Sequence, residues 1–137
     1  GLLACSGPET VATSVRPRCT NYAAVLGPDA AFTGARPVSL DDITDGMSVT
    51  LLIGEVTDAD ILWTQPVDID IAKHPQIGDR QGFSSDHTAV VHFVHADGSV
   101  ARLSHKSPQA FVDALFTRVA SDPSFSELTL PLLSSPR

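Results

Sequence analysis

The sequence is short of basic residues and of long apolar runs. Nine Lys and Arg stand against 16 Asp and Glu, a formal net charge of -7. This balance argues against nucleic acid or an anionic membrane surface as a partner, because both attract positive charge. No apolar run approaches the roughly 18 residues of a membrane-spanning helix, and no signal-peptide pattern is visible.

The sequence motifs of common enzyme classes, GxSxG, HExxH and the P-loop, are missing as well, so we expect no enzymatic activity.

Cysteine is also scarce, with Cys5 and Cys19 the only two in the chain. A disulfide between them would close a loop of about 15 residues and contribute ~3 kcal/mol in the loop-entropy model. Two reduced thiols would instead fit an intracellular protein. The residues alone leave both states open.

What is present fits one globular domain. The chain has 137 residues, of which 42% are hydrophobic and 18% charged, values ordinary for a globular protein. That length can bury a sizeable core. We therefore expect a single domain over 1–137, with an irregular lead-in at 1–19 and an extended tail at 123–137.

The strongest local signal is Asp97-Gly98 between two β-rich runs, 88–96 and 99–104. Such a pair predicts a hairpin with a two-residue type I′ turn, in which both central residues have φ > 0. The predicted register pairs Ala96 with Ser99, His95 with Val100, Phe93 with Arg102 and His92 with Leu103.

Apolar periodicity and capping residues predict the remaining elements. Strands are expected at 20–26 and 47–56, a helical turn capped by Ser39 and Asp42, an irregular segment at 70–86, and a helix at 107–119 with Ser107 as N-cap and Pro108 as its first residue. The expected fold is α+β: an antiparallel sheet containing the 88–104 hairpin, with the C-terminal helix packed on or beside it.

Four separated strings, in order, resemble one known family. They are Thr20-x-Tyr22 with Val25-x-Gly27-Pro28, then Ile43-Thr44-Asp45-Gly46, then Trp63-Thr64-x-Pro66-x-Asp68, and finally His87 followed after nine residues by Asp97-Gly98. The chain thereby resembles, over about 20–118, a bacterial prepilin-type (type IV pilin-like) family of unknown function. That family carries a C-terminal processing-associated domain named for His, nine residues and Asp-Gly. The chain departs from the family pattern at Met47 and Val49.

The resemblance implies a non-catalytic, pilin-like or pseudopilin-like structural head that acts in surface assembly or secretion. It implies a location in the cell envelope or outside the cell, and other protein chains as partners rather than nucleic acid or membrane. In that setting the Cys5–Cys19 disulfide is favoured. Pilin-like heads pack one sheet face on a long N-terminal helix, which this chain does not show, so we expect a fragment or a processed form.

Without that helix, sheet surface should remain uncovered. The predicted strands are apolar on both faces, as Leu51 and Ile53 alternate with Leu52. The helix at 107–119 can cover only part of this surface. We therefore expect an exposed apolar patch of a few hundred Å² along 47–56 and 88–104, or else its cover by 123–137 or by a second chain.

Two other functions stay open. A secreted binding module would use Trp63 and the long 70–86 loop as a ligand platform. An exposed Trp63 would favour the binding module, whereas a buried Trp63 would favour the pilin-like structural head. A hydrolase would use His87 with a nearby carboxylate.

No metal site is expected from the five histidines. His92 and His95 point to opposite faces of one strand, and His92 with His105 would share a face but show no third ligand. The histidines are His74, His87, His92, His95 and His105. Calcium at the acidic residues is a further possibility, but no EF-hand string is present. Those acidic residues are Asp41, Asp42, Asp45, Glu55, Asp58 and Asp60.

Overall fold

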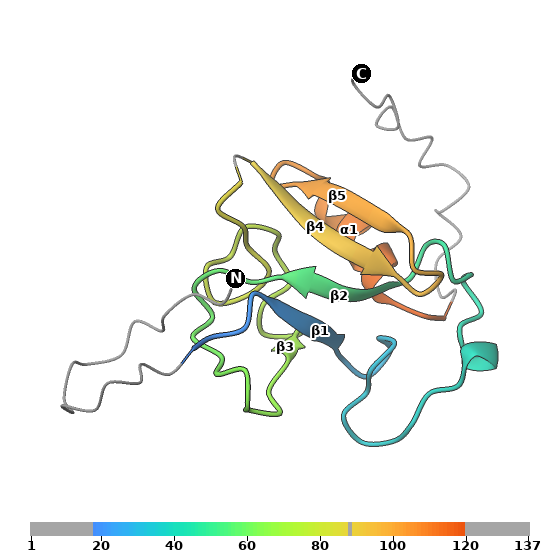
Figure 1. The fold of residues 1–137 in the computed structure, drawn as a ribbon. Helices are drawn as coiled ribbons and strands as arrows, with labels where there is room; N and C mark the ends of the chain where they lie inside the picture. Colours follow the sequence, from blue (N-terminus) through green and yellow to red (C-terminus); the bar gives the residue numbers. More distant parts are fainter. Residues whose placement is uncertain (1–17, 88, 120–137) are drawn as a thin grey trace, which may run out of the picture.

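The strands form one mixed sheet. The computed structural model describes residues 18–87 and 89–119. Its elements are β1 (Tyr22–Leu26), the 3-10 turn η1 (Leu40–Asp42), β2 (Leu51–Glu55), β3 (Ile69–Asp70), β4 (Val90–His95), β5 (Val100–Ser104) and α1 (Gln109–Phe116). The sheet order is β3-β1-β2-β4-β5 (Figure 1). The α+β class is confirmed, but the sheet is not wholly antiparallel, because β3 pairs with β1 in parallel.

Parts of the predicted chain lie outside the described residues. These are most of the lead-in at 1–19, with Cys5, and the tail at 123–137. Cys19 is described. It is buried, and its backbone forms an isolated antiparallel β-bridge with that of Leu62. Its thiol is not free, and its predicted pairing with Cys5 stays a prediction. Of the helices described, none has the length and apolar character needed to cross a membrane.

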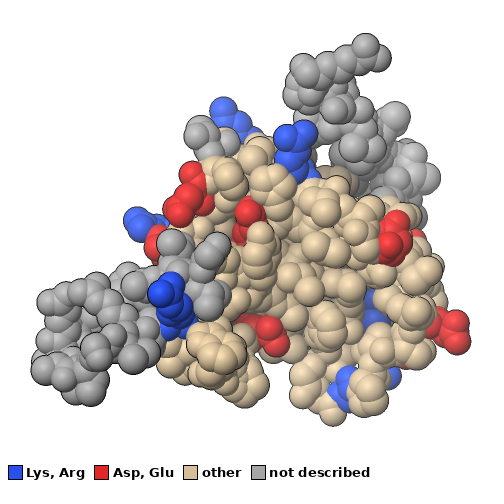
Figure 2. All heavy atoms as spheres, in the orientation of Figure 1, with Lys and Arg blue, Asp and Glu red and all other residues tan. Residues whose placement is uncertain are grey.

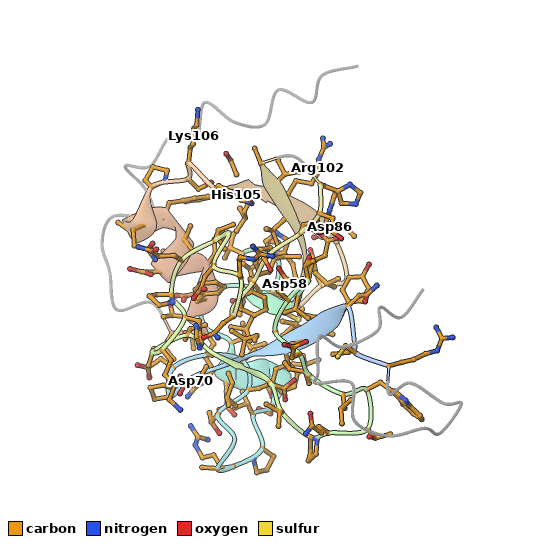
Figure 3. The ribbon with its side chains drawn as sticks, turned by 90° about the vertical axis from the view of Figure 1, so that its left-hand side faces the viewer. Asp58, Asp70, Asp86, Arg102, His105 and Lys106 are labelled. Carbon is orange, nitrogen blue, oxygen red and sulfur yellow. The ribbon has the colours of Figure 1, made fainter. Side chains whose placement is uncertain are left out.

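One face of the sheet is covered by α1 and by the segment that precedes β4 (Figures 1 and 3). Three aromatic rings meet there: the centroid of Phe83 lies 5.0 Å from that of Phe93 and 5.8 Å from that of Phe116. All three are almost fully buried, as are Leu51 and Val25. Aromatic pairs at these separations add to the stabilisation from burial, so this cluster is the centre of the core.

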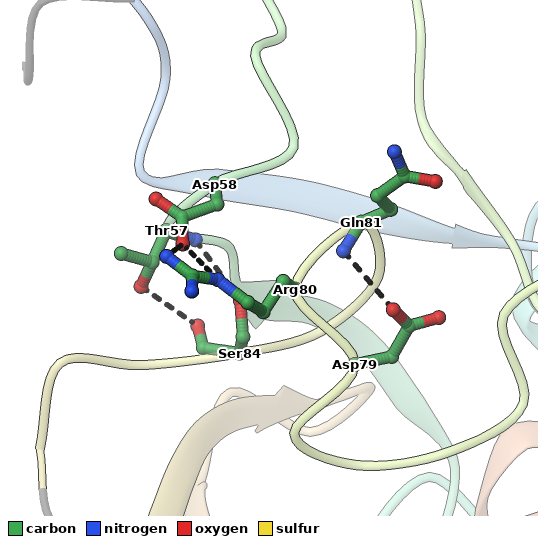
Figure 4. Close-up of polar contacts among 6 residues, drawn as sticks. All are labelled: Thr57, Asp58, Asp79, Arg80, Gln81 and Ser84. Atoms are coloured by element: carbon green, nitrogen blue, oxygen red, sulfur yellow. Dashed lines mark hydrogen bonds and ion pairs between the residues drawn. The ribbon is translucent and has the colours of Figure 1, made fainter. Parts of the chain in front are cut away.

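The irregular segment after β3 is anchored to the rest of the fold. Phe83 inserts into the core, and Thr57 donates two hydrogen bonds of 3.3 Å to Ser84, from its N–H to Ser84 Oγ and from its hydroxyl to the Ser84 carbonyl. Arg80 donates from Nε to Asp58 Oδ2 at 2.7 Å (Figure 4). The predicted irregularity of 70–86 is therefore confirmed beyond Asp70, and buried contacts explain how so long a loop fits a compact domain.

The hairpin is confirmed, but its predicted register is wrong by one residue. His95 N–H donates to the Ser99 carbonyl at 2.9 Å, so three residues and not two form the loop. Gly98 has φ +85°, as predicted, while Asp97 does not have positive φ. This combination matches a type I turn followed by a left-handed residue, the common three-residue hairpin loop. The pairs are Val94 with Val100, Phe93 with Ala101, His92 with Arg102, Val91 with Leu103 and Val90 with Ser104.

Backbone contacts from the segment before β2 explain the longer loop. Ala96 N–H donates to the Thr50 carbonyl at 2.8 Å, and Asp97 N–H donates to the Met47 carbonyl at 3.1 Å. These bonds hold Ala96 in the loop and away from β5. The segment that makes these contacts, 47–50, is not part of β2. The strand predicted at 47–56 therefore begins only at Leu51.

A β-bulge in β2 decides which of its side chains reach the core. Leu51 pairs with His95 and Ile53 with Val94, so β2 carries one extra residue at Leu52. Without the bulge, Leu51 and Ile53 would share a face. With it, Leu51 is fully buried and Ile53 turns to the opposite side.

The helix is shorter than predicted. Pro108 is its N-cap and not its first residue, and the helix ends at Phe116 instead of residue 119. The chain beyond it is held by Arg118, which is 6% exposed. The Arg118 guanidinium donates to the Pro28 and Ala30 carbonyls at 3.1 and 2.8 Å. At η1 the predicted capping is confirmed, because Asp42 Oδ2 accepts from Ser39 N–H at 2.9 Å.

The other face of the sheet is not covered by any described helix. Its outward side chains, here called the open face, include one apolar residue from each of β1, β2, β4 and β5 in direct cross-strand register: Ala24, Ile53, Val94 and Val100. Val100 is 68% exposed and Tyr22 on β1 is 57% exposed. Figure 2 shows broad uncharged areas on this side, with several acidic and basic groups gathered toward its left. The row lies on β2, β4 and β5, within the two segments predicted to carry an exposed apolar patch, and extends onto β1. The area of that patch stays a prediction, and the tail at 123–137 that could cover it lies outside the described residues.

Candidate functional site

The open face is hollowed between β1 and β5. The hollow has a volume of about 470 Å³. Tyr22, Ile53, Val94 and Val100 form its apolar wall, and Glu55, His87 and His92 form its polar rim.

Glu55 and His92 are joined by two hydrogen bonds. The Glu55 carboxylate, at the end of β2, accepts from the His92 N–H at 2.8 Å, and the His92 ring Nδ1 lies 3.0 Å from the same oxygen. Burial by itself raises the pKa of Glu55, but hydrogen bonds from His92 and Ser85 outweigh it and hold that pKa below its usual value. Glu55 is therefore a carboxylate near neutral pH.

His87 completes the group from the loop before β4. Its ring centroid lies 5.5 Å from that of His92, and the two planes are 84° apart. One ligand atom from each of Glu55, His87 and His92 lies within 4.8 Å of the others. Two contacts hold the loop: His87 N–H donates to Ser85 Oγ at 3.1 Å, and Ser84 N–H donates to the Glu55 carbonyl at 3.0 Å.

The residues of the His-x9-Asp-Gly string are not brought together. His87 precedes β4, whereas Asp97 and Gly98 form the loop that follows it. Asp97 Oδ1 accepts from the Ser99 hydroxyl and N–H at 2.6 and 2.8 Å, and these bonds lower the pKa of Asp97. Asp97 and Gly98 are thus explained by turn geometry, while His87 belongs to a separate cluster.

Other candidate residues are dispersed. Trp63 is 65% exposed, the outcome that favours a binding platform, but the 70–86 loop is fixed in the core through Phe83. His105 lies against Gly78. The suggested His92–His105 pair is wrong, because the one-residue change of register puts Arg102 opposite His92.

The remaining histidines and acidic residues have local partners. His74 Nδ1 lies 2.7 Å from Asp79 Oδ2, and that hydrogen bond lowers the pKa of Asp79. His95, at the end of β4, is half-buried. Among the residues described, the acidic set considered for calcium forms no group of three; Asp42 accepts from Ser39, and Asp58 pairs with Arg80.

Sequence reasoning missed the association of Glu55 with His87 and His92. It compared histidines with one another by strand parity and treated Glu55 only as one of several surface acids. The available signal was a glutamate at the end of a strand expected to pair with the hairpin. Placing Glu55 beside His92 required the order of β2 and β4 and the β2 bulge.

No family model, curated protein or solved structure matches the chain. Two imidazoles and one carboxylate can transfer protons or bind a metal ion. The apolar wall beside them can bind another apolar surface.

Proposed function

We propose that this chain is a non-catalytic, pilin-like structural head of an exported or cell-envelope protein, and that it acts by packing its open face against another protein segment or chain. The single observation that carries the proposal is the apolar row Ala24–Ile53–Val94–Val100 across four strands. Ala24, Ile53 and Val94 are partly exposed and Val100 is exposed, and contiguous apolar surface of this kind typically marks interaction sites. The four strings that resemble the prepilin-type family supply the class.

The geometry of the open face supports packing against an extended partner. The row crosses the sheet perpendicular to its strands, and Tyr22 flanks it at one end. Val100 and Tyr22 are more than half exposed, so each has apolar area to lose on association, about 25 cal/mol per Å². The net charge of -7 favours partners that are neutral or basic at their contact surface.

Self-association and dye binding test this proposal. We expect the chain to associate at high concentration, or to increase the fluorescence of a hydrophobic dye, and the double variant Tyr22→Ser/Val100→Ser to lose much of both signals. Val67→Ser is the matched control, because Val67 is 51% exposed but lies outside the row. A wild-type chain that stays monomeric and binds no dye would contradict a docking role for the open face.

The pilin-like class has a separate test in the gene. The class predicts a prepilin cleavage site followed by a long apolar helix upstream of residue 1. Adding that segment as a peptide should suppress dye binding. A gene that encodes neither feature would remove the pilin-like part of the proposal and leave the docking surface in place.

A second candidate function rests on Trp63. Trp63 is 65% exposed and is followed by five exposed residues, 64–68. Exposed tryptophans are typical of ligand and protein contacts. A secreted binding module would show a change of Trp63 fluorescence when a glycan or peptide panel is titrated. Because Trp63 is the only tryptophan in the chain, the variants are compared by calorimetry: Trp63→Ala should abolish binding, whereas Phe32→Ala, a control at another exposed aromatic residue, should leave it unaltered.

A further inference from the structure

Three side chains converge on one point of the hollow from three separate segments. Glu55 comes from the end of β2, His92 from the middle of β4, and His87 from the preceding loop. A ligand atom of each lies within 4.8 Å of the other two. A tetrahedral ion with bonds of about 2.1 Å needs ligand atoms about 3.4 Å apart. The group is therefore close to a binding geometry, and a movement of about 1 Å would complete it.

His87 is the side chain that can make this movement. It is exposed and belongs to a loop, whereas His92 is in a strand and Glu55 is at the end of one. Glu55 and His92 already share a contact of 3.0 Å between Oε2 and Nδ1. An ion bound here would take the place of any proton shared by these two atoms, which would pass to solvent, and binding would require the His87 ring to move inward.

The chemistry of the ligands selects the class of ion. Imidazole nitrogen suits Zn²⁺, Co²⁺, Ni²⁺ and Cu²⁺, whereas Ca²⁺ and Mg²⁺ take oxygen ligands. Two histidines and one glutamate are also the ligand set of one class of zinc site that keeps its fourth position open. Here the fourth position would face the hollow, whose wall beside Glu55 is formed by Tyr22 and Ile53.

The surroundings of the group hold its ligands in place. The Glu55 carboxylate is oriented by the His92 N–H at 2.8 Å, and the Glu55 backbone is tied to Ser84 at 3.0 Å. Contacts of this kind orient metal ligands and increase their affinity. Arg102, the β5 partner of His92, adds a positive charge on the same face. Its side chain is exposed, so solvent screens that charge.

We propose that Glu55, His87 and His92 bind one divalent transition-metal ion, with Zn²⁺ the first choice, at the rim of the hollow on the open face. The site leaves one coordination position for a donor atom from outside the chain. This proposal is independent of the docking function, because it concerns the isolated chain and can hold in a monomer.

Calorimetric titration of the chelator-treated chain with ZnCl₂ tests the proposal. Near neutral pH we expect one Zn²⁺ per chain, and no comparable heat with CaCl₂. His87→Gln should weaken Zn²⁺ binding at least about tenfold. This variant is decisive because His87 is exposed and outside the core, so circular dichroism and the melting temperature should stay unchanged. His92→Gln and Glu55→Gln should weaken binding as well.

Two matched controls separate this group from surface histidines in general. His74→Gln and His105→Gln remove histidines that lie outside the group, and both should retain wild-type Zn²⁺ affinity. Titration with CoCl₂ gives a second readout, since a tetrahedral site produces intense visible absorption that His87→Gln should abolish. Equal Zn²⁺ affinity in wild type and His87→Gln, or a loss of the same size in either control, would overturn the proposal.

Discussion

Gly54 of β2 stands opposite Phe93 of β4, and the missing side chain at 54 makes room for two rings of the core. A Cβ added there would lie 2.6 Å from Phe83 Cδ1 and equally close to Phe93 Cδ1. Replacing Gly by Ala in a strand would otherwise stabilise by roughly 0.5–1 kcal/mol. Overpacking costs about 1–3 kcal/mol, so the steric effect should prevail.

We therefore expect Gly54→Ala to lower the free energy of unfolding by about 1–2 kcal/mol, measured by urea denaturation. A double-mutant cycle with Phe83→Leu supplies the control, because a smaller side chain at 83 relieves the contact. The double variant should be more stable than the sum of the two single effects predicts. Additive effects would show that Phe83 does not limit the space at Gly54.

The hairpin loop yields a prediction about conformation alone. Gly98 has φ +85°, and nothing lies within 4 Å of a Cβ built on it. Gly98→Val should cost about 1–2 kcal/mol, because β-branched residues resist positive φ. Gly98→Asn should cost much less, since Asn tolerates this region. Thermal denaturation compares the two, and equal melting temperatures for both variants would be inconsistent with the left-handed loop residue.

Arg118 should be important for stability although it follows the last helix. Its guanidinium is the donor to the Pro28 and Ala30 carbonyls, and its own carbonyl accepts from Thr44 at 2.9 Å. We expect Arg118→Met to lower the free energy of unfolding by about 2–3 kcal/mol, since both carbonyls lose a charged donor. Arg36→Met is the control at an exposed arginine and should have little effect. A similar loss of unfolding free energy in Arg118→Met and Arg36→Met would mean that the positive charge of arginine, and not the hydrogen bonds to Pro28 and Ala30, stabilises the fold.

Stability should depend on the protonation of His95. Burial lowers the pKa of His95, and the charge of Asp97 and a hydrogen bond with the Thr50 backbone oppose this shift only in part. A histidine with a lowered native pKa stabilises the fold above its unfolded value of about 6.5, and that contribution is lost as pH falls below it. His95→Phe should therefore flatten the fall in stability between about pH 7 and pH 5.

Chemical denaturation across that pH range measures the effect, with chelator present. His87→Gln is the control, because His87 is exposed; this variant should keep the wild-type slope. Carboxylates with a lowered pKa, such as Asp79 and Glu55, lose their contribution to the stability of the fold only below about pH 5. They therefore do not disturb the comparison between His95→Phe and the wild type. An unchanged slope in His95→Phe would assign the pH dependence to other groups.

Local signals in the sequence were sufficient to identify most elements. Asp97-Gly98 predicts the hairpin, because a loop that needs positive φ at one position is most easily made with glycine. Ser39 and Asp42 predict the single turn at 40–42, since a capping contact spans only three residues. These predictions succeed because each depends on interactions between residues close in the chain.

Tertiary structure decided the register of the hairpin and the face of the sheet to which the β2 side chains point. The loop has three residues instead of two because Thr50 and Met47 carbonyls accept from Ala96 and Asp97, contacts that span more than 40 positions. Leu51 and Ile53 face opposite ways because of the bulge at Leu52. A strand's side-chain period is two, so a change of one residue exchanges its faces, and no local pattern encodes that change.

The Glu55–His87–His92 group shows the same division. The sequence determined its ligand types and placed His92 on a strand, but Glu55 lies 37 positions from His92 in the chain. Only the pairing of β2 with β4 brings the carboxylate to the imidazole, and only the Ser84–Ser85 contacts bring His87 beside them. The physical reason is that a site built across strands depends on strand order and register, which are set by the packing of the whole core.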